Sequence, residues 1–330
     1  MTVNTGNTKS MFIIPYHADN NKEEWEEKRM ITDTIEGLFT QTDGDWNAIL
    51  VVNGHSKGLV SNYLSDLKGK YYPKIDIISL DRIVGPGVAR NLAIMRAIEK
   101  GCSFVLFNDA DDISHPKRLE VVKSIFLEKP EVDLIYSTFE VIDENNHQIP
   151  RNKISSPILE ILESHEENPI EGNDTWIKMG TETGYINATS STAVRAKFAY
   201  QCPFPNERAS EDFHSWMRMS AFGANFRYTS LIPTKYRIPS FMTYQASRTR
   251  IGPSNFNRIK TKVDCDGFSK AIEIALVRNI IRPEEIPMLK AKFYRRLAKS
   301  MLREKEYELA NNLIGKANQM ENESYVYINR

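Results

Sequence analysis

Residues 103–112 read Ser-Phe-Val-Leu-Phe-Asn-Asp-Ala-Asp-Asp, a short apolar run followed almost directly by three carboxylates. Four consecutive apolar residues bounded by polar ones predict a β-strand that is buried on both faces. In open α/β sheets, ligands bind beyond the carboxyl ends of the strands. We therefore expect Asp109, Asp111 and Asp112 at a ligand-binding edge, where they repel one another unless a cation lies between them. A polar loop with aspartates capping the next helix is the alternative.

The chain around this stretch alternates strand-length apolar runs with helix-length amphipathic segments. The expected strands are residues 11–16, 48–53, 75–80, 103–108 and 134–138, and the expected helices are residues 22–41, about 59–67, about 88–100 and 116–126. Strand–helix alternation with nearly continuous apolar strands predicts an α/β protein with a mostly parallel sheet and helices on both faces. The apolar stripe of the third helix is expected at Val88, Leu92, Met95 and Ile98.

After about residue 141 the alternation stops. Residues 143–184 are polar and irregular, which predicts long loops and a short helix at 158–162, without a further strand–helix–strand unit. The next expected elements are a helix at 211–222, short strands within 224–239, helices from about 264 onward and a helical hairpin at 290–319. The apolar residues of this tail predict a helical core, and a homodimer surface is the alternative.

Length and charge limit the classes of protein to which the chain can belong. Its 330 residues fit one large domain with an extension, or two domains. Lys+Arg and Asp+Glu number 43 each, so no overall positive field exists to hold nucleic acid. We therefore expect no nucleic-acid partner.

Cysteine usage and hydropathy indicate the compartment. No apolar run approaches the roughly 20 residues that span a bilayer, and the N-terminus lacks the apolar core of a signal peptide. The three cysteines are far apart in the sequence, which favours a reducing cytosol over a disulfide framework. We expect a cytoplasmic protein without a transmembrane segment, with peripheral contact to the inner face of the membrane as a further option.

Two more features are candidates for chemistry. Residues 85–91 read Gly-Pro-Gly-Val-Ala-Arg-Asn at the start of the third helix, where glycine lets a backbone approach a ligand and a helix N-terminus favours phosphate. An ordinary tight turn is the alternative. Residues 210–213 read Ser-Glu-Asp-Phe, and acids in a first helical turn also simply complement the helix dipole.

Five motifs in order carry a resemblance to a known family. They are Phe-Ile-Ile-Pro-Tyr at 12–16, Leu-Val-Val-Asn-Gly-His-Ser at 50–56, Gly-Val-Ala-Arg-Asn-Leu-Ala at 87–93, Val-Leu-Phe-Asn-Asp-Ala-Asp-Asp at 105–112 and Glu-Asp-Phe-His-Ser-Trp-Met-Arg-Met at 211–219. Together they resemble the family 2 nucleotide-sugar glycosyltransferases of the GT-A fold, and the fourth resembles that family's DXD signature. The resemblance covers about residues 11–245.

The resemblance implies roles for the acidic residues. Asp109 would face the ribose or the sugar, and Asp111 would bind a Mn²⁺ or Mg²⁺ ion that bridges the donor's diphosphate. Asp212 would be the general base that deprotonates the acceptor hydroxyl, with Glu211 positioning it. A base and a leaving group on opposite faces of the sugar imply a single displacement with inversion.

The resemblance also implies a nucleotide-sugar site. Its expected residues are Pro15, Tyr16, Asn53, Gly87, Arg90, Asp109, Ala110 and Asp111. Many relatives carry Asp where this chain has Asn53, and because Asn both accepts and donates hydrogen bonds, UDP is the expected but not the required nucleotide. Pro239 lies near a position that is often histidine in relatives and cannot bind a metal. Arg237, Arg248 and Arg250 are then candidates to support the diphosphate, and a solvated surface is the alternative.

These observations predict a metal-dependent, inverting hexosyltransferase that uses a nucleotide sugar. The expected division is a GT-A domain at 1–255, with a nucleotide-sugar half at about 11–140 and an acceptor half at about 141–255, and a helical extension at 256–330. A nucleotidyltransferase and a catalytically degenerate nucleotide-sugar-binding module are the alternatives. The acceptor, whether glycan, lipid-linked glycan, peptide or small molecule, stays open, with Trp176 and Tyr185 as candidate stacking residues or core residues.

Overall fold

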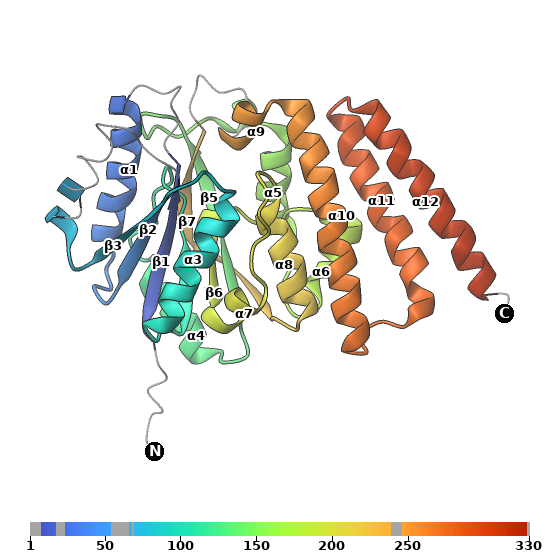
Figure 1. Ribbon diagram of the computed structural model, residues 1–330, viewed down its shortest axis with the longest axis horizontal. Coiled ribbons are helices and arrows are strands. Elements are labelled where there is room, and N and C mark those ends of the chain that lie inside the picture. Colours follow the sequence, from blue (N-terminus) through green and yellow to red (C-terminus); the bar gives the residue numbers. More distant parts are fainter. Residues whose placement is uncertain (1–7, 18–23, 54–65, 68, 239–245, 329–330) are drawn as a thin grey trace, which may run out of the picture.

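The computed structural model describes residues 8–17, 24–53, 66–67, 69–238 and 246–328 (Figure 1). These residues form one seven-stranded sheet in the order β3-β2-β1-β4-β6-β5-β7. The strands are β1 (Ser10–Tyr16), β2 (Asn47–Asn53), β3 (Ile75–Leu80), β4 (Phe104–Phe107), β5 (Leu134–Ile142), β6 (Thr192–Arg195) and β7 (Phe226–Arg237). The carboxyl ends of β1, β2 and β4 therefore meet at one edge of the sheet.

The sheet is mostly parallel, as the sequence predicts. Strand β1 pairs in parallel with β2 and with β4. In the same way β2 pairs in parallel with β3, and β5 with β7. Only β6 among the described strands runs antiparallel, to both β4 and β5. The sequence analysis missed β6, because its four residues, Thr-Ala-Val-Arg, are too few to show a period.

Helices cover both faces of the sheet. One face packs on α1 (Glu24–Phe39) and α4 (Arg118–Glu128), and the other packs on α3 (Pro86–Glu99) and α8 (Glu211–Ala221). Alternate residues of β1 divide between the two cores, with Phe12 and Ile14 on the first face and Met11 and Ile13 on the second. This alternation is the side-chain period of a strand buried on both sides.

The buried face of α3 differs from the expected one. Met95 and Ile98 are exposed, and Val88 and Leu92 are only partly buried. The helix instead faces the core mainly with the small residues Ala89, Ala93 and Ala97, together with Ile94. The prediction of the stripe was wrong because it weighed hydrophobicity alone, whereas alanines let a helix lie close to a sheet.

The second half of the chain is more regular than expected. The region 143–200 contains α5 (Ser156–Glu167), α6 (Thr175–Lys178) and α7 (Ala196–Gln201), and the short strands expected within 224–239 form the single strand β7. One π-helical turn lies at Met179–Thr183, and 3-10 turns lie at Arg151–Lys153, Thr189–Ser191 and Pro283–Glu285. Most of the helix expected at 59–67 lies outside the described residues.

The last helices of the chain lie side by side at the end of the molecule farthest from β3 (Figure 1). They are α10 (Pro253–Val277), α11 (Ile286–Arg303) and α12 (Tyr307–Ile328), and the short helix α9 (Ala246–Ile251) precedes them. Helices α11 and α12 confirm the predicted hairpin. Phe268 of α10 stacks on Phe293 of α11 with ring centroids 4.3 Å apart, and one apolar core runs from the sheet through α8 to these helices. Within the described chain, every helix is too short or too polar to cross a membrane.

Candidate active site

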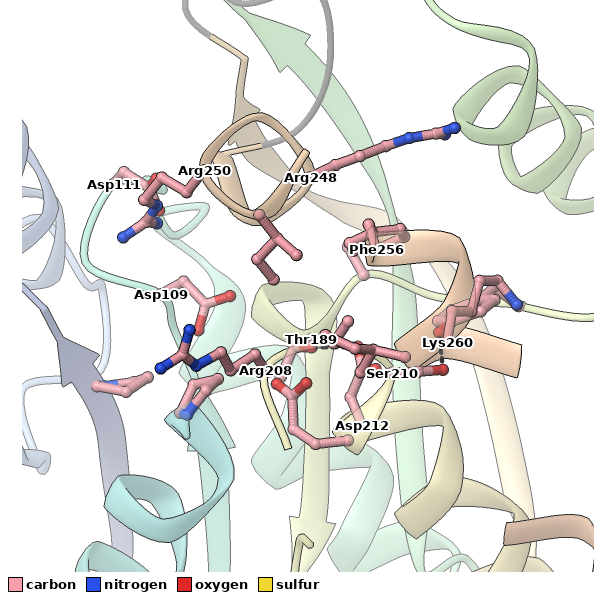
Figure 2. A pocket seen from close by; sticks show the side chains of 18 of the residues that line it. Asp109, Asp111, Thr189, Arg208, Ser210, Asp212, Arg248, Arg250, Phe256 and Lys260 are labelled. Atoms are coloured by element: carbon pink, nitrogen blue, oxygen red, sulfur yellow. Dashed lines mark hydrogen bonds between the residues drawn. The ribbon is translucent and has the colours of Figure 1, made fainter. Parts of the chain in front are cut away.

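A cavity of about 790 Å³ opens where β1, β2 and β4 end, and it continues past α8 to the C-terminal helices (Figure 2). Every predicted site residue except Gly87 lines it, namely Pro15, Tyr16, Asn53, Arg90, Asp109, Ala110, Asp111, Glu211, Asp212, Arg237, Arg248 and Arg250. Figure 2 shows Asp109 and Asp111 on one side and Asp212 and Lys260 on the other. Residues that are more than 100 positions apart thus share one cavity.

The three acids after β4 occupy three different environments. Asp109 and Asp111 line the cavity, whereas Asp112 is buried and does not. The Oδ1 atom of Asp112 accepts a hydrogen bond of 2.8 Å from the backbone N–H of Arg237 on β7. Burial, together with the charges of Asp111 and Asp109, raises the pKa of Asp112 well above its usual range. Asp112 therefore anchors the loop to β7, and only two of the three acids can meet a ligand.

Arg90 joins the acids of the loop to those of α8. Its guanidinium donates one hydrogen bond to Oδ1 of Asp109 at 2.7 Å and another to Oε1 of Glu211 at 2.6 Å. The side chain is almost wholly buried, and the two carboxylates raise the pKa of Arg90 against the opposing effect of burial. Because Arg90 comes from the first turns of α3, this helix fixes the spacing between the two acidic groups.

Glu211 and Asp212 begin α8 and have different partners. Burial raises the pKa of Glu211 to about 7, although Arg90 opposes this shift. Burial also raises the pKa of Asp212. The Oδ2 atom of Asp212 accepts a 2.7 Å hydrogen bond from the hydroxyl of Thr189, and its Oδ1 atom accepts one from the backbone N–H of Phe213. Asp212 thus faces the cavity, and no cationic side chain of the described residues contacts it. Glu211, in contrast, pairs with Arg90.

The two glycines at the start of α3, Gly85 and Gly87, allow close packing of the helix and do not line the cavity. A Cβ atom on Gly87 would lie 2.6 Å from the carbonyl oxygen of Pro205 and 2.7 Å from Cβ of Phe204, and one on Gly85 would lie 2.5 Å from the carbonyl oxygen of Glu207. All three distances are shorter than van der Waals contact allows. Glycine here lets the start of α3 lie close to the segment that leads into α8. The close approach that the sequence predicted is therefore made to protein backbone and not to a ligand.

Comparisons with known proteins show the family of the chain. The sequence model of the family described as glycosyl transferase family 2 matches residues 21–191, which is more than half of the chain. The chain belongs to glycosyl transferase family 2. An uncharacterised glycosyltransferase of Methanocaldococcus jannaschii is 25% identical over 220 residues, covering 66% of this chain and 69% of that protein.

Solved structures support the expected GT-A fold for this family 2 glycosyltransferase. Residues 1–349 of S. aureus TarS, crystallised with UDP-GlcNAc, match with a TM-score of 0.54 and 14% identity, covering 94% of this chain and 92% of that one. GalNAc-T7, crystallised with UDP, GalNAc and Mn²⁺, matches with a TM-score of 0.55 and 12% identity, covering 78% of this chain and 48% of that one. At these identities the likeness concerns the fold.

In this family 2 glycosyltransferase, Asn53 is held by backbone contacts. Its Nδ2 atom donates to the carbonyl oxygen of Val84 at 2.6 Å, and its Oδ1 atom accepts from the N–H of Val84 at 2.9 Å. The ring of His17 contacts the carbonyl oxygen of Asn53 through Nδ1 at 3.0 Å. Asn53 therefore shapes the cavity wall by fixing residue 84, and both ends of its amide are already in use. Pro239 lies outside the described residues.

The arginines of the cavity are not equivalent. The buried side chain of Arg237 donates to the backbone oxygens of Asp111 and Asp143, so it holds the acidic loop in place. Arg248 forms an ion pair with Glu304, the residue that follows α11. Arg250 is exposed and lines the cavity. Arg208, which the sequence analysis did not single out, also lines the cavity and makes no hydrogen bond or ion pair with any described residue.

The C-terminal helices complete the cavity of the glycosyltransferase. Phe256 and Lys260 of α10 and Met301 of α11 line it, as does Tyr185, whose ring stacks on Phe213. Trp176, the other candidate for stacking, is fully buried against Phe268 and lies outside the lining. Sequence reasoning named Tyr185 but missed Phe256, Lys260 and Met301, because residues of a helix facing a distant site carry no local signal.

Proposed function

We propose that the chain transfers a hexosyl group from a UDP-sugar to an acceptor hydroxyl, by a single displacement with inversion and with the help of a divalent cation. The observation that carries the proposal is that Asp111 and Asp212 line the same cavity, with Arg90 joining the neighbouring acids Asp109 and Glu211. The relatives crystallised with UDP add support for the nucleotide.

The donor set of the cavity fits a hard divalent cation. Such ions are commonly held by one or two carboxylates, with substrate phosphates and water completing the shell. Asp111 is the proposed protein ligand, with Asp109 beside it. The described residues contain no group of three or more His, Cys, Asp and Glu side chains suited to a metal, so the remaining ligands are expected from the donor. When bound, the ion supplies positive charge next to the departing diphosphate.

The acceptor side of the proposal rests on Asp212. Its carboxylate takes the proton of the acceptor hydroxyl as the acceptor oxygen bonds to the anomeric carbon, and the electrons of the breaking C–O bond leave with the nucleoside diphosphate. A pKa that burial has raised makes this carboxylate a better base near neutral pH. Glu211, already tied to Arg90, positions the turn that carries Asp212.

The nucleotide is proposed to bind beside Pro15, Tyr16 and Asn53 at the ends of β1 and β2. The diphosphate is proposed to bind near Arg250 and Arg208, because both arginines are exposed and line the cavity. Ala110 contributes only its small volume between the two acids. Arg237 and Arg248 contact protein groups and are proposed to shape the site.

The proposed division of the chain keeps a nucleotide-sugar half at about 11–140, an acceptor half at about 141–255 and a helical extension at 256–330. Phe256 and Lys260 line the cavity from the extension side of that boundary. We propose that the helical extension forms part of the cavity wall that contacts the acceptor.

The function is tested by incubating the protein with UDP- and GDP-sugars in Mn²⁺ and measuring thermal stabilisation and nucleotide release. We expect UDP-sugars to raise the melting temperature in Mn²⁺ but not in EDTA, because ligands that bind the native state stabilise it. Released UDP and a product of inverted anomeric configuration would support transfer. Release of pyrophosphate from a nucleoside triphosphate would instead support a nucleotidyltransferase, and stabilisation without any product would support a degenerate binding module.

A further inference from the structure

A buried polar cluster joins α10 to the turn just before the proposed base. We define the Ser210 cluster as Tyr185, Ser210, Lys260 and Asp264. Asp264 of α10 is fully buried, and its two carboxylate oxygens accept hydrogen bonds from the hydroxyl of Ser210 and the ammonium of Lys260. The hydroxyl of Tyr185 also contacts Ser210. A buried carboxylate whose two oxygens both accept hydrogen bonds is held in one position.

Ser210 has an unusual backbone conformation. It is the N-cap residue of α8, yet its φ angle is 65°, in the left-handed region, and its side chain makes no capping hydrogen bond to the helix. This conformation is strained for a residue other than glycine. The Ser210 side chain points to Asp264 instead, so the contact with α10 holds a turn that the helix by itself would not favour.

The turn at Ser210 sets the position of the first residues of α8. The backbone oxygen of Ser210 accepts a hydrogen bond from the N–H of His214 at 3.1 Å, and Glu211 and Asp212 lie between them in the sequence. Farther along, α10 and α8 are as close as backbones allow, because a Cβ atom on Gly267 would lie 2.9 Å from Cα of His214. His214 also contacts Asp266 at 2.8 Å.

From these contacts we propose that Asp264 is a positioning residue that acts through Ser210 on Asp212. The proposal rests on the function proposed above, since it gives the C-terminal extension a role in holding the general base. Asp264 itself does not line the cavity. Its removal takes away the contact between α10 and Ser210, lets the left-handed turn relax and shifts Asp212 relative to the acceptor, while the donor-binding loop after β4 is unaffected.

The test compares Asp264→Ala with a matched control, Asp266→Ala, which breaks the other polar contact between α10 and α8. The assay is the release of UDP from UDP-GlcNAc in Mn²⁺, with water as acceptor. A misplacement of about 1 Å costs about 100-fold in rate, so we expect kcat to fall by about 10- to 100-fold in Asp264→Ala with little change in KM. Asp266→Ala should keep the kcat of the wild type.

Two further variants separate positioning from general loosening. Asp264→Asn keeps an oxygen that can accept from Ser210 and should restore most of the lost kcat. Ser210→Gly suits the left-handed backbone and leaves the Lys260–Asp264 pair intact, so it tests the same hydrogen bond if Asp264→Ala fails to fold. Equal losses of kcat in Asp264→Ala and Asp266→Ala would overturn the proposal.

The double variant with Asp212→Asn distinguishes this proposal from the proposed function. If Asp264 acts through Asp212, adding Asp264→Ala to Asp212→Asn gives no further loss of turnover. A further loss as large as in the wild type overturns the positioning role alone, whereas wild-type turnover in Asp212→Asn overturns the proposed function. If UDP release is immeasurable, amide hydrogen exchange decides, since the amide of His214 should exchange faster in Asp264→Ala than in Asp266→Ala, and equal rates overturn the proposal.

Discussion

The loop after β4 and the start of α8 each place acids at the cavity, but they treat these acids differently. In the loop, Asp111 meets the cavity while Asp112 turns inward and binds the backbone of β7. At the start of α8, Glu211 is tied to Arg90, whereas Asp212 has a hydroxyl and a backbone N–H as partners. In both regions adjacent acids divide into one that anchors and one that faces the ligand.

In this molecule, the group that a carboxylate contacts decides its role more than its position in a sequence motif does. Glu211 is bound to the buried Arg90 and Asp112 to the backbone of β7, so both hold the structure in place. Asp111 and Asp212 line the cavity, where a ligand can reach them. Five substitutions in four experiments test this division, beginning with the one expected to have the largest effect.

Replacing Asp212 with Asn removes the proposed base at constant volume. We expect turnover to fall by about 10³-fold, within the range that general-base catalysis contributes. Binding of UDP in Mn²⁺, measured by calorimetry, should stay at its wild-type value, because the donor side is unchanged. Wild-type turnover would show that Asp212 anchors the helix in the same way as Glu211.

Replacing Arg90 with Met leaves Asp109 and Glu211 without their shared cation. Removing one partner of a buried ion pair costs about 3–5 kcal/mol, so we expect a loss of that order in the unfolding free energy, measured with denaturant at pH 8. The loss should be smaller at pH 5, where Glu211, whose pKa burial raises, can take up a proton. Arg96→Met is the control, since Arg96 lies on the same helix in an exposed pair with Glu99. A loss as small as that of the control would mean that Arg90 does not hold the two regions together.

Asp111→Asn and Asp112→Asn compare the two acids of the loop directly. We expect Asp111→Asn to weaken Mn²⁺-dependent UDP binding by about 10- to 100-fold, as expected for the loss of one charged contact. Asp112→Asn should leave this affinity near that of the wild type, because the raised pKa of Asp112 already disfavours its charge. Calorimetry with and without EDTA measures both. Equal effects of the two variants would contradict the division of the loop.

Glu211→Gln has the smallest expected effect, on the pH dependence of stability. The pKa of Glu211 is raised from 4.5 to about 7, so between these values the unfolded chain loses its proton first and stability falls as the pH rises. Between pH 5 and pH 7.5 the wild type should lose of the order of 2 kcal/mol more than Glu211→Gln, as measured by denaturant unfolding at both pH values. Parallel profiles for the two proteins would place the titrating group elsewhere.

Much of the architecture was predictable because it depends on local patterns. The alternation of strands and helices gave the mostly parallel sheet, and the hairpin of α11 and α12 followed from helical periodicity. The stripe on α3 was predicted wrongly, and β6 was missed, because close packing of alanines and pairing of a four-residue strand are decided by neighbours that a local pattern does not contain.

Every residue that the sequence predicted for the site, apart from Gly87, lines the cavity. The sequence did not predict that Arg237 and Arg248 are engaged by the protein, nor that Thr189 contacts Asp212. These contacts join segments that are distant along the chain, and their geometry follows from how the strands and helices pack.

By itself the sequence determined the order of strands and helices and the acids that follow β4 and begin α8, since periodicity and residue chemistry are properties of the chain. Only the tertiary structure decided which of those acids faces the cavity, that Arg90 joins them, and that α10 completes the wall. The physical reason is that burial and the nearest charged partner set the state of a carboxylate, and both depend on residues brought together by folding.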